Sequence, residues 1–173
     1  MLRKIAYLII ILTILSACDS KNNAKRQNQN VSSAKALEKA NKYLIRTEYE
    51  DIENYMRRHG LNMEETGSGL RYLIYKRGDG EKAEKGKVAV LDYRLSLITG
   101  DVIYSSVTDG QKVFKIGQGN VESGLEEAIL YMHVGDKAKL ILPAHLAYGL
   151  LGDDNKIPPR STLVYDIELI DIK

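Results

Sequence analysis

Leu163-Val-Tyr-Asp-Ile-Glu-Leu169 is the stretch that decides the fold. With the two-residue period of a β-strand, one face carries Leu163, Tyr165, Ile167 and Leu169, and the other carries Asp166 and Glu168. We therefore expect a half-buried strand with Tyr165 pointing inward. The residues before it are Pro143-Ala-His-Leu-Ala-Tyr-Gly149, a polar loop and Ile157-Pro-Pro159. They predict a strand end, an exposed corner at Tyr148 and a mobile loop.

Other segments have the composition of strands, namely 70–77, 88–97, 102–106, 112–116 and 138–142. Between the last two of these segments, the apolar residues have the spacing of one face of a helix, namely Leu125, Ala128, Ile129 and Met132. Ser123 is the expected N-cap of this helix, Glu126 follows three residues on, and Gly135 is its expected end. Strands joined by short turns around one short helix favour an α+β fold, with an antiparallel sheet packed on that helix.

Two parts of the chain carry a resemblance to a known family. They are the entry motif Thr66-Gly-Ser-Gly-Leu-Arg-Tyr72, and Ala147-Tyr-Gly149 with the Ile157-Pro-Pro159 to Leu169 stretch. These motifs resemble FKBP-type peptidyl-prolyl cis-trans isomerases, from about Leu70 to Lys173. The resemblance implies an FKBP-like twisted antiparallel sheet of about five strands, a half-barrel wrapped round the short helix. It also implies isomerisation of Xaa-Pro segments without a cofactor.

The same resemblance implies the residues of the site. The expected catalytic residues are Tyr148, Tyr93, Tyr165 and Tyr104, and the expected substrate-binding residues are Ile103, Val121, Glu122, Leu125 and Ile157. In this scheme the Tyr148 hydroxyl donates to a substrate carbonyl, while Tyr93 and Tyr165 are aromatic walls. From the strand and helix patterns alone, Tyr93, Leu125 and Tyr165 are better explained as core residues, because they lie on inward faces, whereas a loop tyrosine such as Tyr148 is better explained by function.

Prolyl isomerisation needs no nucleophile, because its barrier of about 18–20 kcal/mol comes from amide resonance. A dry aromatic cup with one or two hydrogen-bond donors is enough to favour the twisted amide. His59, His133 and His145 are scattered without the spacing of metal ligands, so we expect no metal site.

Two positions depart from the family pattern. Tyr104 stands where the family has an aspartate, and Glu122 replaces an apolar residue. A phenol can hydrogen-bond but brings no charge. These departures keep a second hypothesis open, a proline-peptide-binding or scaffold module on the same fold with weak or no catalysis.

The N-terminal segment has the features of a secretion signal. Arg3 and Lys4 precede an apolar run over residues 5–15 that is too short to span a bilayer, and Leu15-Ser-Ala-Cys18 follows. This ending resembles the bacterial lipobox. We therefore expect a signal peptide over residues 1–17 and lipid attachment at Cys18. The protein would be anchored in the cell envelope, facing the periplasm, on the inner or the outer membrane.

The segment 18–33 is polar and is expected to be a disordered tether. Segment 34–66 is expected to be helical, with an amphipathic helix ending at Gly60, and segment 67–173 is the expected isomerase domain. The helix over residues 34–59 either packs on its own domain, remains a solvated stalk, or pairs with a second copy in a homodimer.

Net charge and composition limit the function classes. The net charge is +2 with both signs mixed along the chain, which excludes the electrostatic footprint of a nucleic-acid-binding protein. A single cysteine excludes an intrachain disulfide. The motif Gly124-Leu-Glu-Glu-Ala128 and the sequence after it also resemble gliding-motility isomerase lipoproteins of the Bacteroidota. The sequence thus predicts an isomerase that assists the folding of exported proteins.

Overall fold

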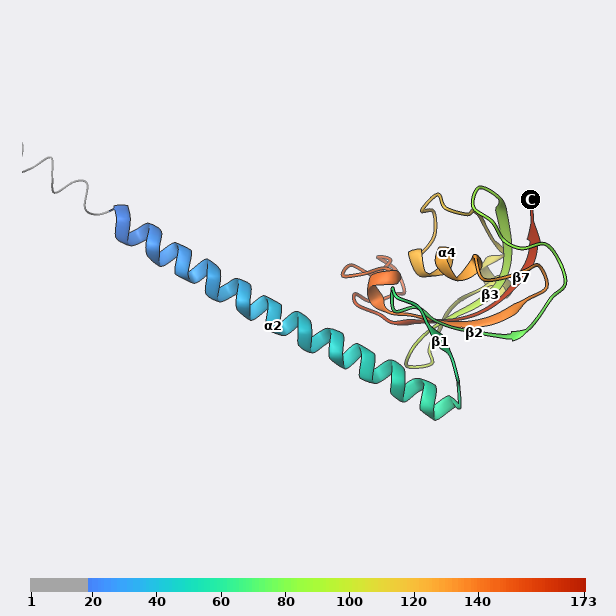
Figure 1. Ribbon diagram of the computed structural model, residues 1–173, viewed down its shortest axis with the longest axis horizontal. Helices are drawn as coiled ribbons and strands as arrows, with labels where there is room; N and C mark the ends of the chain where they lie inside the picture. The colour runs from blue at the N-terminus through green and yellow to red at the C-terminus, as the bar shows by residue number, and fades with distance from the viewer. Residues whose placement is uncertain (1–18) are drawn as a thin grey trace, which may run out of the picture. The chain divides into compact units, whose positions relative to one another are not determined.

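The computed structural model describes residues 19–173, so the expected signal peptide 1–17 and Cys18 lie outside the described residues. The chain divides into two units, Met1–Thr47 and Glu48–Lys173. Helix α2, Asp19–His59, runs through this division (Figure 1). Among the described residues no helix is both long and apolar enough to cross a membrane.

Helix α2 begins at Asp19 and not at Ala34, so residues 19–33 are helical where a disordered tether was expected. The physical reason lies in the sequence, because no glycine or proline interrupts the chain between Asp19 and His59. The end of the helix is as expected. Gly60 takes φ +62°, and the backbone N–H of Leu61 donates to the Met56 carbonyl at 2.9 Å.

One antiparallel sheet forms the body of the second unit. Its strands are β1 Glu64–Glu65, β2 Arg71–Lys76, β3 Val88–Leu97, β4 Val102–Ser105, β5 Lys112–Lys115, β6 Lys137–Leu142 and β7 Leu163–Ile172. They lie in the order β1-β2-β6-β7-β3-β4. Strand β3 is long enough to pair with β5 through residues 88–91 and with β4 through residues 94–96. The expected α+β fold is confirmed, with seven strands where about five were expected.

The inner face of the sheet carries the main core. From β7 it buries Leu163, Tyr165, Ile167 and Leu169, as the alternation predicted. Helix α4, Ser123–Ile129, lies across this face and adds Leu125, Ala128 and Ile129 (Figure 1). The other short helices are α3, Ser106–Asp109, and the 3₁₀ turn η1, Ala144–Leu146.

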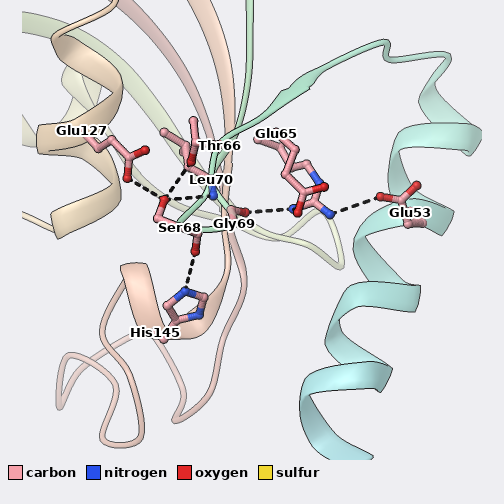
Figure 2. Close-up of polar contacts among 9 residues, drawn as sticks. Glu53, Glu65, Thr66, Ser68, Gly69, Leu70, Glu127 and His145 are labelled. Atoms are coloured by element: carbon pink, nitrogen blue, oxygen red, sulfur yellow. Dashed lines mark hydrogen bonds and ion pairs between the residues drawn. The ribbon is translucent and has the colours of Figure 1, made fainter. Parts of the chain in front are cut away.

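The outer face is covered by the last turns of α2. Ile52 is 2% exposed and packs with Ile141 and Val164, the outward residues of β6 and β7. The guanidinium of Arg71, also buried, pairs with Glu53 at 3.3 Å and Glu65 at 2.9 Å (Figure 2). The end of the helix is therefore packed on its own domain.

The start of α4 differs from the expected capping box. The N-cap is Glu122, and the Ser123 hydroxyl instead donates to the Leu146 carbonyl at 3.3 Å. The Glu126 carboxylate accepts the N–H groups of Gln118 and Gly119 in the preceding loop. The helix stops at Ile129, well before the expected end at Gly135.

Truncation of Ile52 tests the packing of α2 on the sheet. We expect Ile52→Ala to lower the free energy of unfolding by about 2–5 kcal/mol, because it leaves a cavity between helix and sheet. The control is Val107→Ala, where the side chain is 93% exposed and the expected cost is small. Urea unfolding of both variants makes the measurement. Equal stability of the two would contradict the packing.

Candidate functional site

The structure brings the predicted site residues together at one end of the main core. The residues come from β3 (Tyr93), β4 (Ile103 and Tyr104), the approach to α4 (Val121 and Glu122), α4 itself (Leu125) and the segment from η1 to β7 (Tyr148, Ile157), with Tyr165 on β7. Leu125, Ile157 and Tyr165 are buried core residues. Tyr93, Ile103, Tyr104, Val121 and Tyr148 are partly buried and pack against the same core. The candidate site is therefore formed by residues of the main core and by residues that pack directly on it.

Tyr93 and Tyr165 form an aromatic pair because their strands are neighbours. In the β3–β7 ladder Tyr93 lies opposite Ile167, and Leu95 lies opposite Tyr165. The two rings are diagonal neighbours, with centroids 6.2 Å apart and an interplanar angle of 52°. Such a tilted pair offers two ring faces to a small apolar group.

The Glu122 carboxylate is the polar centre of the site, with a side chain only 1% exposed. It accepts the Tyr165 hydroxyl at 2.8 Å, and its negative charge also acts on the Tyr148 phenol. Burial, followed by the charge of Glu122, raises the pKa of both phenols. Both tyrosines are therefore neutral hydrogen-bond donors at physiological pH.

Lys112 on β5 is a site residue that the sequence analysis missed. Its Nζ lies 3.4 Å from Glu122 Oε2 and 3.1 Å from the Tyr165 hydroxyl. It also lies 5.3 Å from the centroid of the Tyr93 ring and 5.6 Å from that of Tyr165. The two-residue period of a strand could have indicated it, because Lys112 lies on the same face as buried Phe114 and therefore points inward.

Tyr104 does not leave the site without a carboxylate. Its hydroxyl donates to Asp153 Oδ2 at 2.6 Å, across 49 positions of the chain. Asp153 Oδ1 accepts the backbone N–H of Ile157 at 2.7 Å and that of Asn155 at 3.0 Å. The Tyr104 phenol brings no charge of its own, and the carboxylate beside it belongs to Asp153.

The loop before β7 was expected to be mobile, but the structure ties it by hydrogen bonds. The N–H of Arg160 donates to the Gly149 carbonyl at 2.8 Å. A Cβ on Gly152, which has φ +81°, would lie 2.2 Å from the Ile157 carbonyl oxygen. Only glycine allows the loop to fold back so closely.

The corner that carries Tyr148 is also held from the rest of the domain. Glu48 Oε1 on α2 accepts the Ala144 N–H at 2.7 Å and the Thr162 hydroxyl at 2.6 Å. On the other side, His145 Nε2 lies 2.9 Å from the Ser68 carbonyl oxygen, and the Ser68 hydroxyl donates to Glu127 of α4 (Figure 2). These contacts fix both ends of the loop. Among residues 34–173, whose side chains the structure describes, no group of three His, Cys, Asp or Glu side chains could hold a metal ion.

The pKa of the Asp153 carboxyl tests the loop. Desolvation raises this pKa, but the hydrogen bonds from Tyr104 and from the N–H groups of Ile157 and Asn155 lower it by more, so it lies below its usual value. The stabilisation is thus present above the unfolded-state pKa of about 3.9 and lost as the pH falls through the lower folded value. We expect the NMR shift of the Ile157 amide to hold down to about pH 4 and to change below it.

The pair of variants Asp153→Asn and Asp154→Asn separates the two neighbouring acids. Asp153→Asn should remove this acid transition, whereas Asp154→Asn should keep it, because the exposed Asp154 makes no bond to Ile157. A transition that survives Asp153→Asn would refute the assignment.

Comparison with known proteins adds the family to this geometry. Residues 79–170 match the model of the FKBP-type peptidyl-prolyl cis-trans isomerase family. The chain is 45% identical to FK506-binding protein 2 of Yarrowia lipolytica over 93 residues, 53% of this chain and 65% of that protein. It is 35% identical to the FKBP-type peptidyl-prolyl cis-trans isomerase FkpA of Buchnera aphidicola over 163 residues, 87% of this chain and 64% of that protein.

The crystal structure of FkpA from Escherichia coli superposes with a TM-score of 0.63 at 28% identity, covering 86% of this chain and 71% of that one. The chain spans less than two thirds of the length of the two curated relatives above. The match of residues 79–170 covers more than half of the chain, and the FKBP-like fold expected from the sequence is confirmed. The chain belongs to the FKBP-type peptidyl-prolyl cis-trans isomerase family.

Proposed function

We propose that the protein catalyses cis-trans isomerisation of Xaa-Pro bonds. The observation that carries the proposal is the Tyr93 and Tyr165 ring pair beside the Tyr148 phenol, three side chains that the fold brings to one site. The ring pair suits the apolar ring of proline. The raised pKa of Tyr148 keeps its hydroxyl protonated as a donor.

The proposed mechanism needs only binding and orientation. The prolyl ring packs against the pair formed by Tyr93 and Tyr165, with Leu125 beneath it and Ile157 at its edge. The Tyr148 hydroxyl donates a hydrogen bond to a substrate carbonyl. The twisted amide has less resonance than the planar amide, so a cup that fits the twisted form lowers the barrier. No covalent bond and no cofactor are involved.

A second candidate function is favoured by one observation. In the free protein, Lys112 and Glu122 already fill the hydrogen-bonding positions around the Tyr165 hydroxyl. A site so occupied also suits a proline-peptide-binding or scaffold module with weak turnover. The variant Tyr104→Asp, which restores the family aspartate, separates the two: a parent without activity and a variant that gains it would favour the binding module.

We propose that in the cell the protein assists the folding of exported proteins and supports gliding motility. The support is the signal-like segment 1–17 and the lipobox-like ending at Cys18, which would anchor the protein in the envelope facing the periplasm. A homodimer through residues 34–59 is part of this proposal. Its support is the exposed apolar side chains on α2, which include Leu37, Tyr43 and Ile45.

Removal of one hydroxyl tests the isomerase proposal. We expect the full-length protein to accelerate isomerisation of a short Xaa-Pro peptide and Tyr148→Phe to lower kcat/KM about tenfold, the value of one hydrogen bond. The matched control is Tyr131→Phe, where an exposed tyrosine stacks on Tyr72 outside the site and activity should be unchanged. Peptide NMR exchange spectroscopy measures the rates. An equal fall in both variants would remove Tyr148 from the mechanism.

Replacement of Cys18 tests the anchor. In cells given a radiolabelled fatty acid, the protein should carry the label and sediment with membranes, because acylation makes the attachment firm. Cys18→Ser should lose both properties. A variant that still carries label and still sediments would mean that another part of the chain holds it to the membrane.

A further inference from the structure

An ion pair lies inside the aromatic site. The Lys112 ammonium is in contact with Glu122 and with the Tyr165 hydroxyl, and it lies within 6 Å of the ring centroids of Tyr93 and Tyr165 at 5.3 and 5.6 Å. The cup that the proposed mechanism gives to proline thus already accommodates a cation. Isomerisation of an Xaa-Pro bond does not by itself require the charge of Lys112 or that of Glu122.

The two partners of this pair are not equally free to move. Lys112 is 20% exposed on its side chain and has a flexible stem, so its ammonium can swing to solvent. Glu122 is 1% exposed and is held by the Tyr165 hydroxyl, which donates to its Oε1 at 2.8 Å. When a prolyl ring enters the cup, Lys112 must leave and Glu122 stays. A buried carboxylate that loses its cation is costly.

We propose that Glu122 is a specificity-determining residue that makes the site prefer segments with lysine or arginine beside the proline. This inference rests on the proposed isomerase function. The cation of the segment takes over the compensation that Lys112 provides in the free protein. An uncharged segment leaves the carboxylate uncompensated, and an acidic segment adds a second negative charge.

The charged side chains around the site also favour a positively charged segment. The Asp153 carboxylate accepts the Tyr104 hydroxyl at 2.6 Å, and the Asp109 carboxylate accepts the backbone N–H of the next residue, Ser105, at 2.9 Å. Lys156 is the nearby counter-charge, with its Nζ 4.9 Å from the Tyr104 ring centroid. Once Lys112 has withdrawn, these named groups leave three carboxylates facing one ammonium, which attracts a cationic segment.

The experiment compares two peptides that differ only in charge. The peptides are Ala-Lys-Pro-Phe and Ala-norleucine-Pro-Phe, because norleucine has the same four-carbon stem as lysine without the ammonium. For each protein, NMR exchange gives kcat/KM and NMR titration gives the affinity, at low salt. The quantity of interest is the lysine-to-norleucine ratio.

We expect a ratio of about ten in the wild-type protein, the size expected of one partly screened charge pair. The ratio should fall to about one in Glu122→Gln and should shrink in about 0.5 M salt. Lys112→Met should raise the ratio, because it removes the internal competitor. The matched control is Glu84→Gln, an exposed acid on a turn outside the site, which should keep the wild-type ratio.

Several outcomes overturn the inference. A lysine-to-norleucine ratio near one in the wild-type protein, both in kcat/KM and in affinity, overturns it. If the norleucine peptide is nevertheless accelerated, the isomerase function still stands. If no peptide is accelerated, the isomerase function fails. The inference is then decided by affinity: it stands if the wild-type protein binds the lysine peptide more tightly and Glu122→Gln does not, and it is overturned otherwise. If Glu122→Gln does not fold, a ratio unmoved by both salt and Lys112→Met overturns it.

Discussion

The antiparallel pairing of β3 with β7 is the constraint on which the rest of the structure depends. The ladder runs from Ala89 opposite Ile172 to Leu97 opposite Leu163. Because side chains alternate between faces, this register puts Tyr93 and Tyr165 on the inner face and Val164 on the outer face. A slip of the register by one residue would exchange the inner and outer side chains of a strand. It would remove the pair of tyrosine rings from the inner face and the residues against which Ile52 packs from the outer face. The core and the site are therefore specified by the same hydrogen bonds.

The outer face takes part in building the site. Glu48 accepts one hydrogen bond from the residue that opens η1 and another from the residue before β7, Ala144 and Thr162. These are the two ends of the segment that carries Tyr148 and Ile157. On the same helix Glu53 pairs with buried Arg71 next to the Ser68 turn, which in turn contacts His145 (Figure 2). A helix packed behind the sheet thus helps to fix a loop at its edge.

The fold could be predicted from the sequence wherever a period or a motif was strong. The alternation from Leu163 to Leu169 gave the inner face of β7, and Gly60 gave the end of α2. The cap of α4 was wrong because its acid, Glu126, binds the preceding loop, a tertiary contact that no local rule contains. The predicted start of α2 differs from the structure because a polar segment without glycine or proline can still continue a helix.

The site shows why residues judged one at a time mislead. Each polar departure from the family pattern has a partner that is distant in sequence: Tyr104 reaches Asp153, and Glu122 reaches Lys112 and Tyr165. Considered alone, Tyr104 is a lost charge and Glu122 is a misplaced one. Together with their partners they are satisfied, and among the described residues no buried side-chain polar atom lacks a hydrogen bond. A buried polar group is tolerated when its partners are present, so these departures make a site of different polarity and not a damaged one.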